Sequence, residues 1–337
     1  LHLCDRRQRQ MCIRDRFYHW GIIQKVVGAF AWVLRKFMNI SGSEGLVAAG
    51  NIFMGMTESP VLIKNYLPTM NRSEIFLVMV SGMGTIAGSV MGTYIGMLGG
   101  TDPAAKVLFA THLLSASVMA VPGSIVLAKM LCPQTEEATD HVAISGKEKE
   151  NSNILDAISS GTVTGVKLMT NIAAMLLVFI SLVALANYIT EGVIGRYTGL
   201  NDWIVKITDG KAQGLTFQFI LGVITSPFMW LIGVPSQDIM LVGSLLGQKT
   251  ILNEFVAYFQ LQQWKDAGLF MYEKSILMST YILCGFANIS SIGILLGGLG
   301  VLAPEKRGLI SRIGVPAMIG GALVSVLSAT IIGMILG

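Results

Sequence analysis

The stretch Asn51-Ile-Phe-Met-Gly-Met-Thr-Glu-Ser-Pro60 decides how this chain folds. It lies in an apolar segment that several polar or helix-breaking residues interrupt. A helix rises about 1.5 Å per residue, so crossing about 30 Å of hydrocarbon takes about 20 mainly apolar residues. The segment is too short and too polar to cross. Broken backbone is tolerated at membrane depth only where it is buried or lines a cavity, so we predict a re-entrant hairpin over residues 46–64.

The composition predicts an all-α polytopic membrane protein. The 337 residues are 53% hydrophobic and 13% charged, with a mean hydropathy of +0.64, whereas soluble domains have about 25% charged residues. The net charge of +4 is spread over many loops and forms no basic stripe for nucleic acid. The cysteines lack paired spacing, and no Walker loop, Ser/His/Asp order or HExxH motif occurs, so we predict neither an enzyme nor a cofactor.

Outward from the hairpin, one order of elements occurs twice. Spans at 74–98 and 104–131 follow the first hairpin and complete a first repeat over 45–131. A second hairpin at 214–248 and spans at 274–300 and 313–336 form a second repeat over 214–337. A single span between the copies inverts the second. Inverted repeats with interrupted segments are typical of transporters whose binding site lies near the midplane.

The remaining segments flank or join the repeats. Residues 17–44 mix apolar positions with lysine and arginine, which predicts an amphipathic helix along the membrane interface. We expect a polar loop over 132–165, and a scaffold span with an interfacial helix over 166–213. Residues 1–16 read unlike the rest, and our hypothesis is that they are a wrong start or a sequencing artefact. Within the span 74–98, glycines at a four-residue interval predict one smooth helix face for close packing; they are Gly84, Gly88, Gly92 and Gly96.

Two carboxylates lie deep in apolar sequence. Glu58 belongs to the first hairpin, and Glu254 lies in Lys249-Thr-Ile-Leu-Asn-Glu-Phe-Val-Ala-Tyr258. At bilayer depth an ionisable side chain is costly unless it faces a partner, a cavity or a ligand. Ionised carboxylates accept hydrogen bonds strongly, so the pair suits a ligand rich in N–H or O–H donors, such as a base edge or a sugar. The alternative is that each pairs with a nearby lysine, Lys64 or Lys249.

The first hairpin tip also offers uncharged oxygens. Asn51 and Thr85 supply side-chain oxygens, and the carbonyls of Met54 and Ile86 are expected to be freed where helices break. Neutral, hard ligands of this kind suit a weakly bound, exchangeable monovalent cation. The alternative is that Asn51 and Thr85 merely join helices by hydrogen bonds.

A second polar group follows in the span 274–300. Asn288 and Ser291 are three residues apart and share one helix face, with Phe286 near the same break. Spacing alone leaves open whether these residues join helices or contact a substrate.

Three runs resemble the signatures of the concentrative nucleoside transporters: Gly50 to Pro60, Gly243 to Tyr258, and Cys284-Gly-Phe-Ala-Asn-Ile-Ser-Ser-Ile-Gly293. The resemblance covers about residues 18–336. It implies a homotrimer in the cytoplasmic membrane, in which each protomer imports a nucleoside with sodium as coupling ion by an elevator-like movement. The alternatives are a proton-coupled nucleoside symporter and a non-transporting, gate-type nucleoside-recognition protein.

The resemblance also implies a role for individual residues. It places the nucleoside at Met56, Thr57, Glu58, Val90, Glu254, Phe286, Asn288 and Ser291, and sodium at Asn51, Met54, Thr85 and Ile86. Many members have Gln where this chain has Met56, which leaves the base preference undetermined. Members usually begin with further spans, so we expect this chain alone to insert or trimerise poorly.

Overall fold

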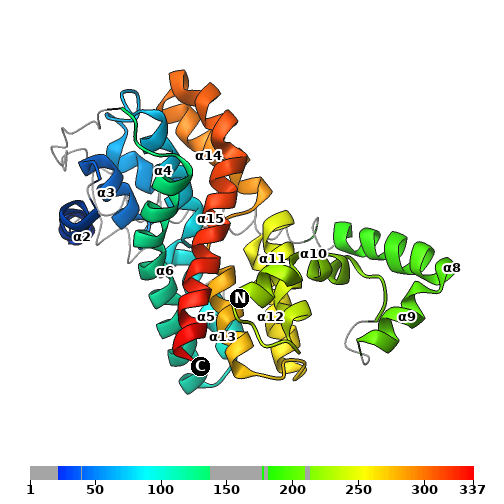
Figure 1. The fold of residues 1–337 in the computed structure, drawn as a ribbon. Coiled ribbons are helices and arrows are strands. Elements are labelled where there is room, and N and C mark those ends of the chain that lie inside the picture. Colours follow the sequence, from blue (N-terminus) through cyan, green and yellow to red (C-terminus); the bar gives the residue numbers. More distant parts are fainter. Residues whose placement is uncertain (1–21, 39, 137–176, 178–180, 209–212) are drawn as a thin grey trace.

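The structure is a computed structural model that describes residues 22–38, 40–136, 177, 181–208 and 213–337. These residues form helices and no strand (Figure 1). The expectations for residues 1–16, for positions 137–165 of the polar loop and for positions 166–176 of the scaffold span lie outside the described residues.

In the first half of the chain, the described residues form five α-helices and one short 3₁₀ helix. They are α2 (Ile22–Met38), α3 (Gly42–Gly50), the 3₁₀ helix η1 (Ser59–Ile63), α4 (Arg72–Gly84), α5 (Gly88–Gly99) and α6 (Pro103–Leu131). Both α3 and α4 begin at capping boxes, in which Ser41 pairs with Glu44 and Asn71 with Glu74. Of the region 17–44 expected at the interface, the described helix is α2, because residues 42–44 already belong to α3.

The second half begins with an arm that projects from the rest in Figure 1 and contains η2 (Tyr188–Gly195), α8 (Arg196–Thr198) and α9 (Leu200–Ile207). Next come α10 (Phe217–Leu231), α11 (Ile239–Ile251), α12 (Glu254–Asp266), α13 (Glu273–Leu283), α14 (Ile289–Leu302), η3 (Pro304–Lys306) and α15 (Arg307–Ile335). Helix α15 packs against α4, α6, α13 and α14, and so joins the two halves.

The predicted smooth glycine face is wrong, because the helix breaks at residues 85–87. A methyl group at Gly84 would lie 3.1 Å from the Val324 side chain on α15, whereas one at Gly88 would lie 3.2 Å from the Phe53 carbonyl oxygen. Gly96 has no such neighbour within 4 Å. Gly84 and Gly88 therefore pack against different segments, and the glycines do not form one continuous packing face.

The second hairpin lies later in the chain than predicted. Residues 214–248 do contain a helix, a turn and a helix, since α10 packs along α11. However, the chain breaks again at Leu252 and Asn253, and α12 starts at Glu254. The unit that matches α3 and η1, with a carboxylate where its second arm begins, is α11 with α12. The apolar sequence of α10 concealed this, because α10 itself is long enough to look like a hairpin arm.

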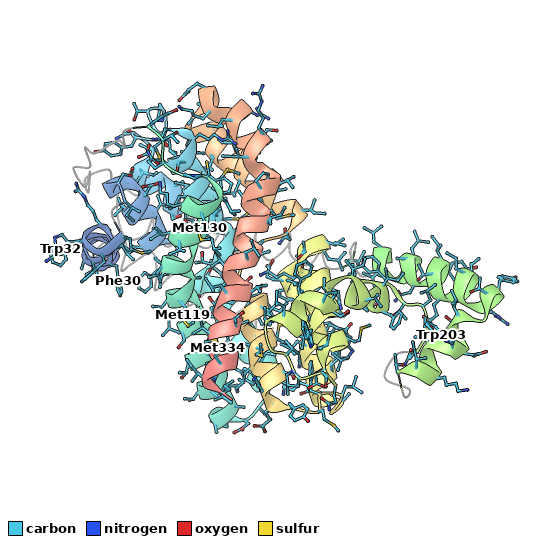
Figure 2. The ribbon with its side chains drawn as sticks, viewed as in Figure 1. Phe30, Trp32, Met119, Met130, Trp203 and Met334 are labelled. Atoms are coloured by element: carbon cyan, nitrogen blue, oxygen red, sulfur yellow. The ribbon has the colours of Figure 1, made fainter. Side chains whose placement is uncertain are left out.

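The exterior of the molecule is apolar over much of its length. Three helical stretches are long and apolar enough to cross a membrane, Arg72–Gly99, Pro103–Leu131 and Pro304–Ile335. Large exposed side chains include Trp32 of α2, Met130 of α6 and Met334 of α15, which are 63%, 71% and 74% exposed (Figure 2). Exposing so large an apolar surface to water is unfavourable, so we expect lipid to cover it.

Candidate functional site

The two interrupted spans meet at their breaks. The break between α4 and α5 and the break between α13 and α14 are joined by a backbone hydrogen bond, in which Phe286 N donates to the Thr85 carbonyl oxygen at 3.3 Å. The approach is close, because a methyl group at Gly285 would lie 2.9 Å from the Met83 carbonyl oxygen. Segments about 200 residues apart in the chain are thereby held side by side, at the places where their helices leave carbonyls and N–H groups unpaired.

Glu254 lies at this crossing and is held by two donors. Its Oε1 accepts a hydrogen bond from the Tyr94 hydroxyl at 3.1 Å, and its Oε2 accepts one from Asn288 Nδ2 at 3.0 Å. The carboxylate is 6% exposed. Tyr94 is fixed in turn, since its ring stacks on Tyr258 of α12 with centroids 4.1 Å apart. The sequence alternative of an ion pair with Lys249 is wrong, because that ammonium donates to Ile282 O and Ser325 Oγ.

Asn288 joins this carboxylate to the start of α14. Its Oδ1 caps the helix by accepting from Ser291 N at 2.9 Å, and it also accepts from the Ser291 and Ser290 hydroxyls. Asn253 caps α12 in the same way, through Val256 N. Two helix N-termini therefore converge near Glu254, and their partial positive charge offsets part of the cost of burying this carboxylate.

The first hairpin tip carries a second, uncharged polar chain. Ser59 Oγ donates to Asn51 Oδ1 at 2.6 Å, Asn51 Nδ2 donates to Ser81 Oγ at 2.9 Å, and Thr85 Oγ1 donates to the Ser81 carbonyl at 2.9 Å. All four residues are buried. The hydrogen bonds that the sequence offered as an alternative for Asn51 and Thr85 therefore exist.

The same tip fits a small cation. The ends of α3 and α4 meet here, and helix C-termini carry partial negative charge. Met54 and Ile86 are buried, and among the described residues neither carbonyl accepts a backbone N–H outside the helices. A sodium ion prefers such uncharged oxygens, and the hydroxyl of Thr85 keeps free lone pairs for it.

The residues expected near the base lie farther from Glu254. Thr57 is exposed and Glu58 is partly buried. A methyl group at Gly298 would contact Thr57 at 3.3 Å, and Gly298 lies ten residues, about 15 Å of helix, beyond Asn288. Met56 is only 8% exposed and packs on Gly82, and Val90 is partly buried against the apolar core. The structure thus groups Glu254, Asn288 and Ser291, and holds Thr57 apart from Asn288.

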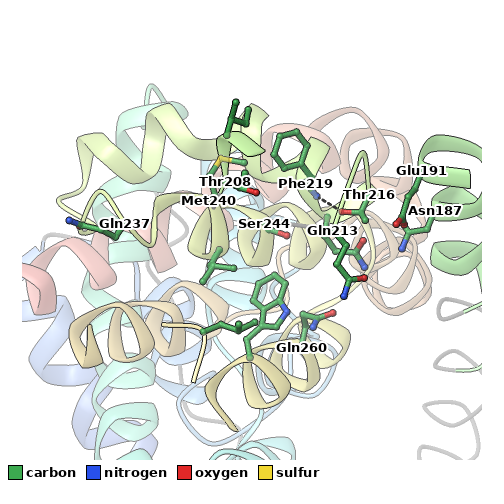
Figure 3. A pocket seen from close by; sticks show the side chains of 15 residues that line it. Asn187, Glu191, Thr208, Gln213, Thr216, Phe219, Gln237, Met240, Ser244 and Gln260 are labelled. Carbon is green, nitrogen blue, oxygen red and sulfur yellow. Dashed lines mark hydrogen bonds between the residues drawn. The ribbon is translucent and has the colours of Figure 1, made fainter. Parts of the chain in front are cut away.

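A separate cavity lies on the other side of the second hairpin. It has a volume of 550 Å³ and is bounded by α10, α11, α12 and the projecting arm (Figure 3). Amide and hydroxyl side chains line it together with Trp264, and Figure 3 shows Gln213, Gln260 and Ser244 among them. None of the residues predicted to bind nucleoside or sodium lines this cavity.

Sequence reasoning missed Tyr94, Ser59 and Ser81. Tyr94 is separated from Glu254 by 160 residues, so no local pattern could join them. Ser59 was visible beside Glu58 in the first hairpin, and a hydroxyl next to two polar residues in apolar sequence was a signal for it. Ser81 carries no such signal, because small hydroxyl residues are common in membrane helices.

Inverted halves, each with a hairpin and a broken span, and a buried carboxylate held where the two breaks cross define a secondary transporter by fold and site. Comparison with known protein families leads to the same class of protein. The family described as Na+ dependent nucleoside transporter C-terminus matches residues 112–333, and the family described as nucleoside recognition matches residues 15–101. The chain belongs to the family of concentrative, sodium-dependent nucleoside transporters, a family of membrane transporters and not of enzymes.

The sequences of individual relatives match nearly all of this chain. An uncharacterized transporter of Haemophilus influenzae is 39% identical over 95% of this chain and 72% of its own length. Sodium/nucleoside cotransporter 1 of Rattus norvegicus is 38% identical over 96% of this chain, which spans 49% of that protein. The chain therefore spans about half the length of the mammalian relatives and nearly three quarters of the bacterial one.

Solved structures show the same fold. CNTnw in an inward-facing, substrate-bound state is 35% identical and superposes with a TM-score of 0.84, covering 97% of this chain and 73% of its own. A doubly substituted form of CNTnw in an outward-facing state is 34% identical, with a TM-score of 0.86 and the same 97% coverage of this chain. The all-α, elevator-type architecture expected from the sequence is confirmed by these similarities.

Proposed function

We propose that this protein imports nucleosides across the cytoplasmic membrane, driven by the sodium gradient. The observation that carries the proposal is the buried carboxylate of Glu254, held by Tyr94 and Asn288 at the crossing of two broken helices. The relatives named as sodium/nucleoside cotransporters support the choice of substrate and ion. Ribose hydroxyls are donors, and they would bind the carboxylate oxygens of Glu254 while the amide of Asn288 and the hydroxyl of Ser291 complete the contact.

The base would bind on the other side of the crossing. Thr57 and Glu58 lie at the first hairpin tip, and Val90 and Phe286 would form apolar walls for the ring. Glu58 accepts N–H donors from the base edge when ionised. Because Thr57 lies against Gly298, about 15 Å of helix beyond Asn288, we include closure of the first hairpin over the substrate.

Sodium would bind at the side chains of Asn51 and Thr85 and at the carbonyls of Met54 and Ile86. Thr85 connects this position to the substrate side, since its carbonyl accepts the N–H of Phe286. A cation that fixes Thr85 therefore also fixes the break that leads to Asn288. Ion and nucleoside then bind with positive coupling, and the coupling is reciprocal by linkage.

The assembly and the movement belong to the same proposal. We expect a homotrimer, with each protomer carrying its own substrate. CNTnw has been solved in inward-facing, intermediate and outward-facing states, and an alternation of this kind would carry the crossing and its ligands from one side of the membrane to the other.

Uptake into proteoliposomes tests the proposal. Radiolabelled uridine and adenosine are offered with sodium or with choline outside, to the wild type and to Glu254→Gln. We expect sodium to raise nucleoside affinity about tenfold, and Glu254→Gln to lose most uptake. Glu273→Gln is the matched control, because Glu273 also begins a helix but is exposed. Uptake that ignores sodium and follows pH would replace sodium by protons, and binding without uptake would favour a recognition protein that does not transport.

A further inference from the structure

A lysine is completely buried in the second repeat, and among the described residues no carboxylate forms a salt bridge with it, although Glu254 attracts it from a longer distance. Lys249 lies in the last turn of α11 and is 0% exposed. Its ammonium donates to the Ile282 carbonyl oxygen at 2.8 Å and to Ser325 Oγ at 2.8 Å. The Ser325 hydroxyl gives its own proton to Ala322 O, so it can only accept from the lysine. Lysine is almost never fully buried unless paired, which makes this cation expensive to keep.

The surroundings explain why a cation is tolerated at this position. Helix α11 ends at Ile251 and α13 ends at Leu283, and Ile282 is among the last four residues of α13. The last carbonyls of a helix lack an intrahelical partner and carry partial negative charge. The Lys249 ammonium thus lies where two helix C-termini meet.

The first repeat has the same arrangement without a cation of its own. There α3 ends at Gly50 and α4 ends at Gly84, and Asn51 reaches Ser81 in the last turn of α4. In both repeats, a side chain at the end of the first hairpin arm reaches the helix that precedes the break in the span. Asn51 reaches the last turn of α4, and Lys249 reaches the last turn of α13. The first repeat supplies a neutral amide and uncharged oxygens, whereas the second supplies an ammonium.

We propose that Lys249 is the built-in cation of the second repeat, a positioning residue that holds the ends of α11 and α13 together as a bound sodium would hold α3 and α4. The inference rests on the proposed function, since it concerns the same transport cycle. Glu254 follows the end of α11 by three residues and Asn288 follows the end of α13 by five, so the tether sets the distance between them. Only the first repeat then takes a cation from solution, so one sodium accompanies each nucleoside.

The first test removes the positive charge of Lys249 and keeps a side chain of similar size. Uridine uptake by Lys249→Met, Lys249→Arg and Lys306→Met is measured over a range of uridine and sodium concentrations. Lys306 is the matched control, because its ammonium also donates to a backbone carbonyl at 2.8 Å, that of Met70, away from the site. We expect Lys249→Met to raise KM for uridine at least about tenfold, Lys249→Arg to recover part of the loss, and Lys306→Met to change KM less than about twofold.

The second test distinguishes charge from packing. Lys249→Ala leaves space for n-propylammonium, which replaces the removed atoms, and we expect this cation to restore uridine binding where propanol does not. Normal KM in Lys249→Met, or equal rescue by propanol, would overturn the proposal. Should neither variant fold, the wild type decides: one sodium ion per uridine supports the built-in cation, and two refute it. Wild-type uptake without sodium dependence would instead count against the proposed function itself.

Discussion

Gly285 is the residue at which the crossing of the two breaks can be tested most directly. Its φ is +156°, and an added methyl group would lie 2.9 Å from Met83 O and 3.0 Å from Gly84 O. Both neighbours are backbone atoms held by α4, so neither can rotate away. A strained backbone position costs about 1–3 kcal/mol, and overpacking costs about 1–3 kcal/mol more. We therefore expect Gly285→Ala to lower the free energy of unfolding by about 3 kcal/mol.

Thermal unfolding of the purified protein measures this cost. A loss of about 3 kcal/mol lowers Tm by roughly 4 °C in a chain of 337 residues. Gly297→Ala is the matched control, since Gly297 lies inside α14 and a methyl group there meets nothing within 4 Å. An alanine in a helix interior is favoured over glycine by about 0.5–1 kcal/mol, so the control should be unchanged or slightly stabilised.

The same variant should also lose transport. If the crossing moves apart, Phe286 N can no longer donate to Thr85 O, and the two parts of the site lose their common support. We expect uridine uptake to fall with Tm in Gly285→Ala and to persist in Gly297→Ala. A Gly285→Ala protein as stable and as active as the wild type would show that the two breaks do not approach as closely as described.

Three further predictions concern single side chains. Tyr94→Phe removes the donor to Glu254 but keeps the ring stack, so nucleoside affinity should fall about tenfold with little change in Tm; equal loss in both would indicate a packing role. Ser59→Ala removes the hydrogen bond that orients Asn51, and the sodium concentration for half-maximal uptake should rise about tenfold, while an unchanged value would remove Ser59 from the ion site. Met56→Gln should change the ratio of uridine to adenosine uptake and, because position 56 is buried, lower stability by about 1–3 kcal/mol; an unchanged ratio would separate this position from base recognition.

Much of the fold was predictable because it depends on local composition. Apolar runs and their interruptions indicated the hairpin at Glu58, the repeated order of elements and the membrane location. The returning arm of the first hairpin is a short 3₁₀ helix and not the α-helical half that the sequence suggested. The second hairpin was placed too early, because periodicity alone does not tell a packed helix such as α10 from a hairpin arm.

The site was predictable in part, because polar residues in apolar sequence can be recognised from local composition. Glu254, Asn288 and Asn51 were recognisable as polar residues in apolar sequence, and the structure holds Glu254 and Asn288 in contact. Neither the partner of Lys249 nor the role of Tyr94 could be inferred, since both depend on residues far along the chain. The expected contact of Thr57 and Glu58 with the Glu254 group remains a prediction.

By itself the sequence determined the class of this protein: that it is an all-α membrane protein with a broken first hairpin, and that two carboxylates lie deep in apolar sequence. These follow from solvation and backbone hydrogen bonding, which act on neighbouring residues. Only the tertiary structure decided that the breaks at Thr85 and Phe286 meet, that Gly285 permits their approach, and that a lysine holds one repeat where the other has neutral oxygens. Those features arise from close packing between segments distant in the chain, and no local pattern records them.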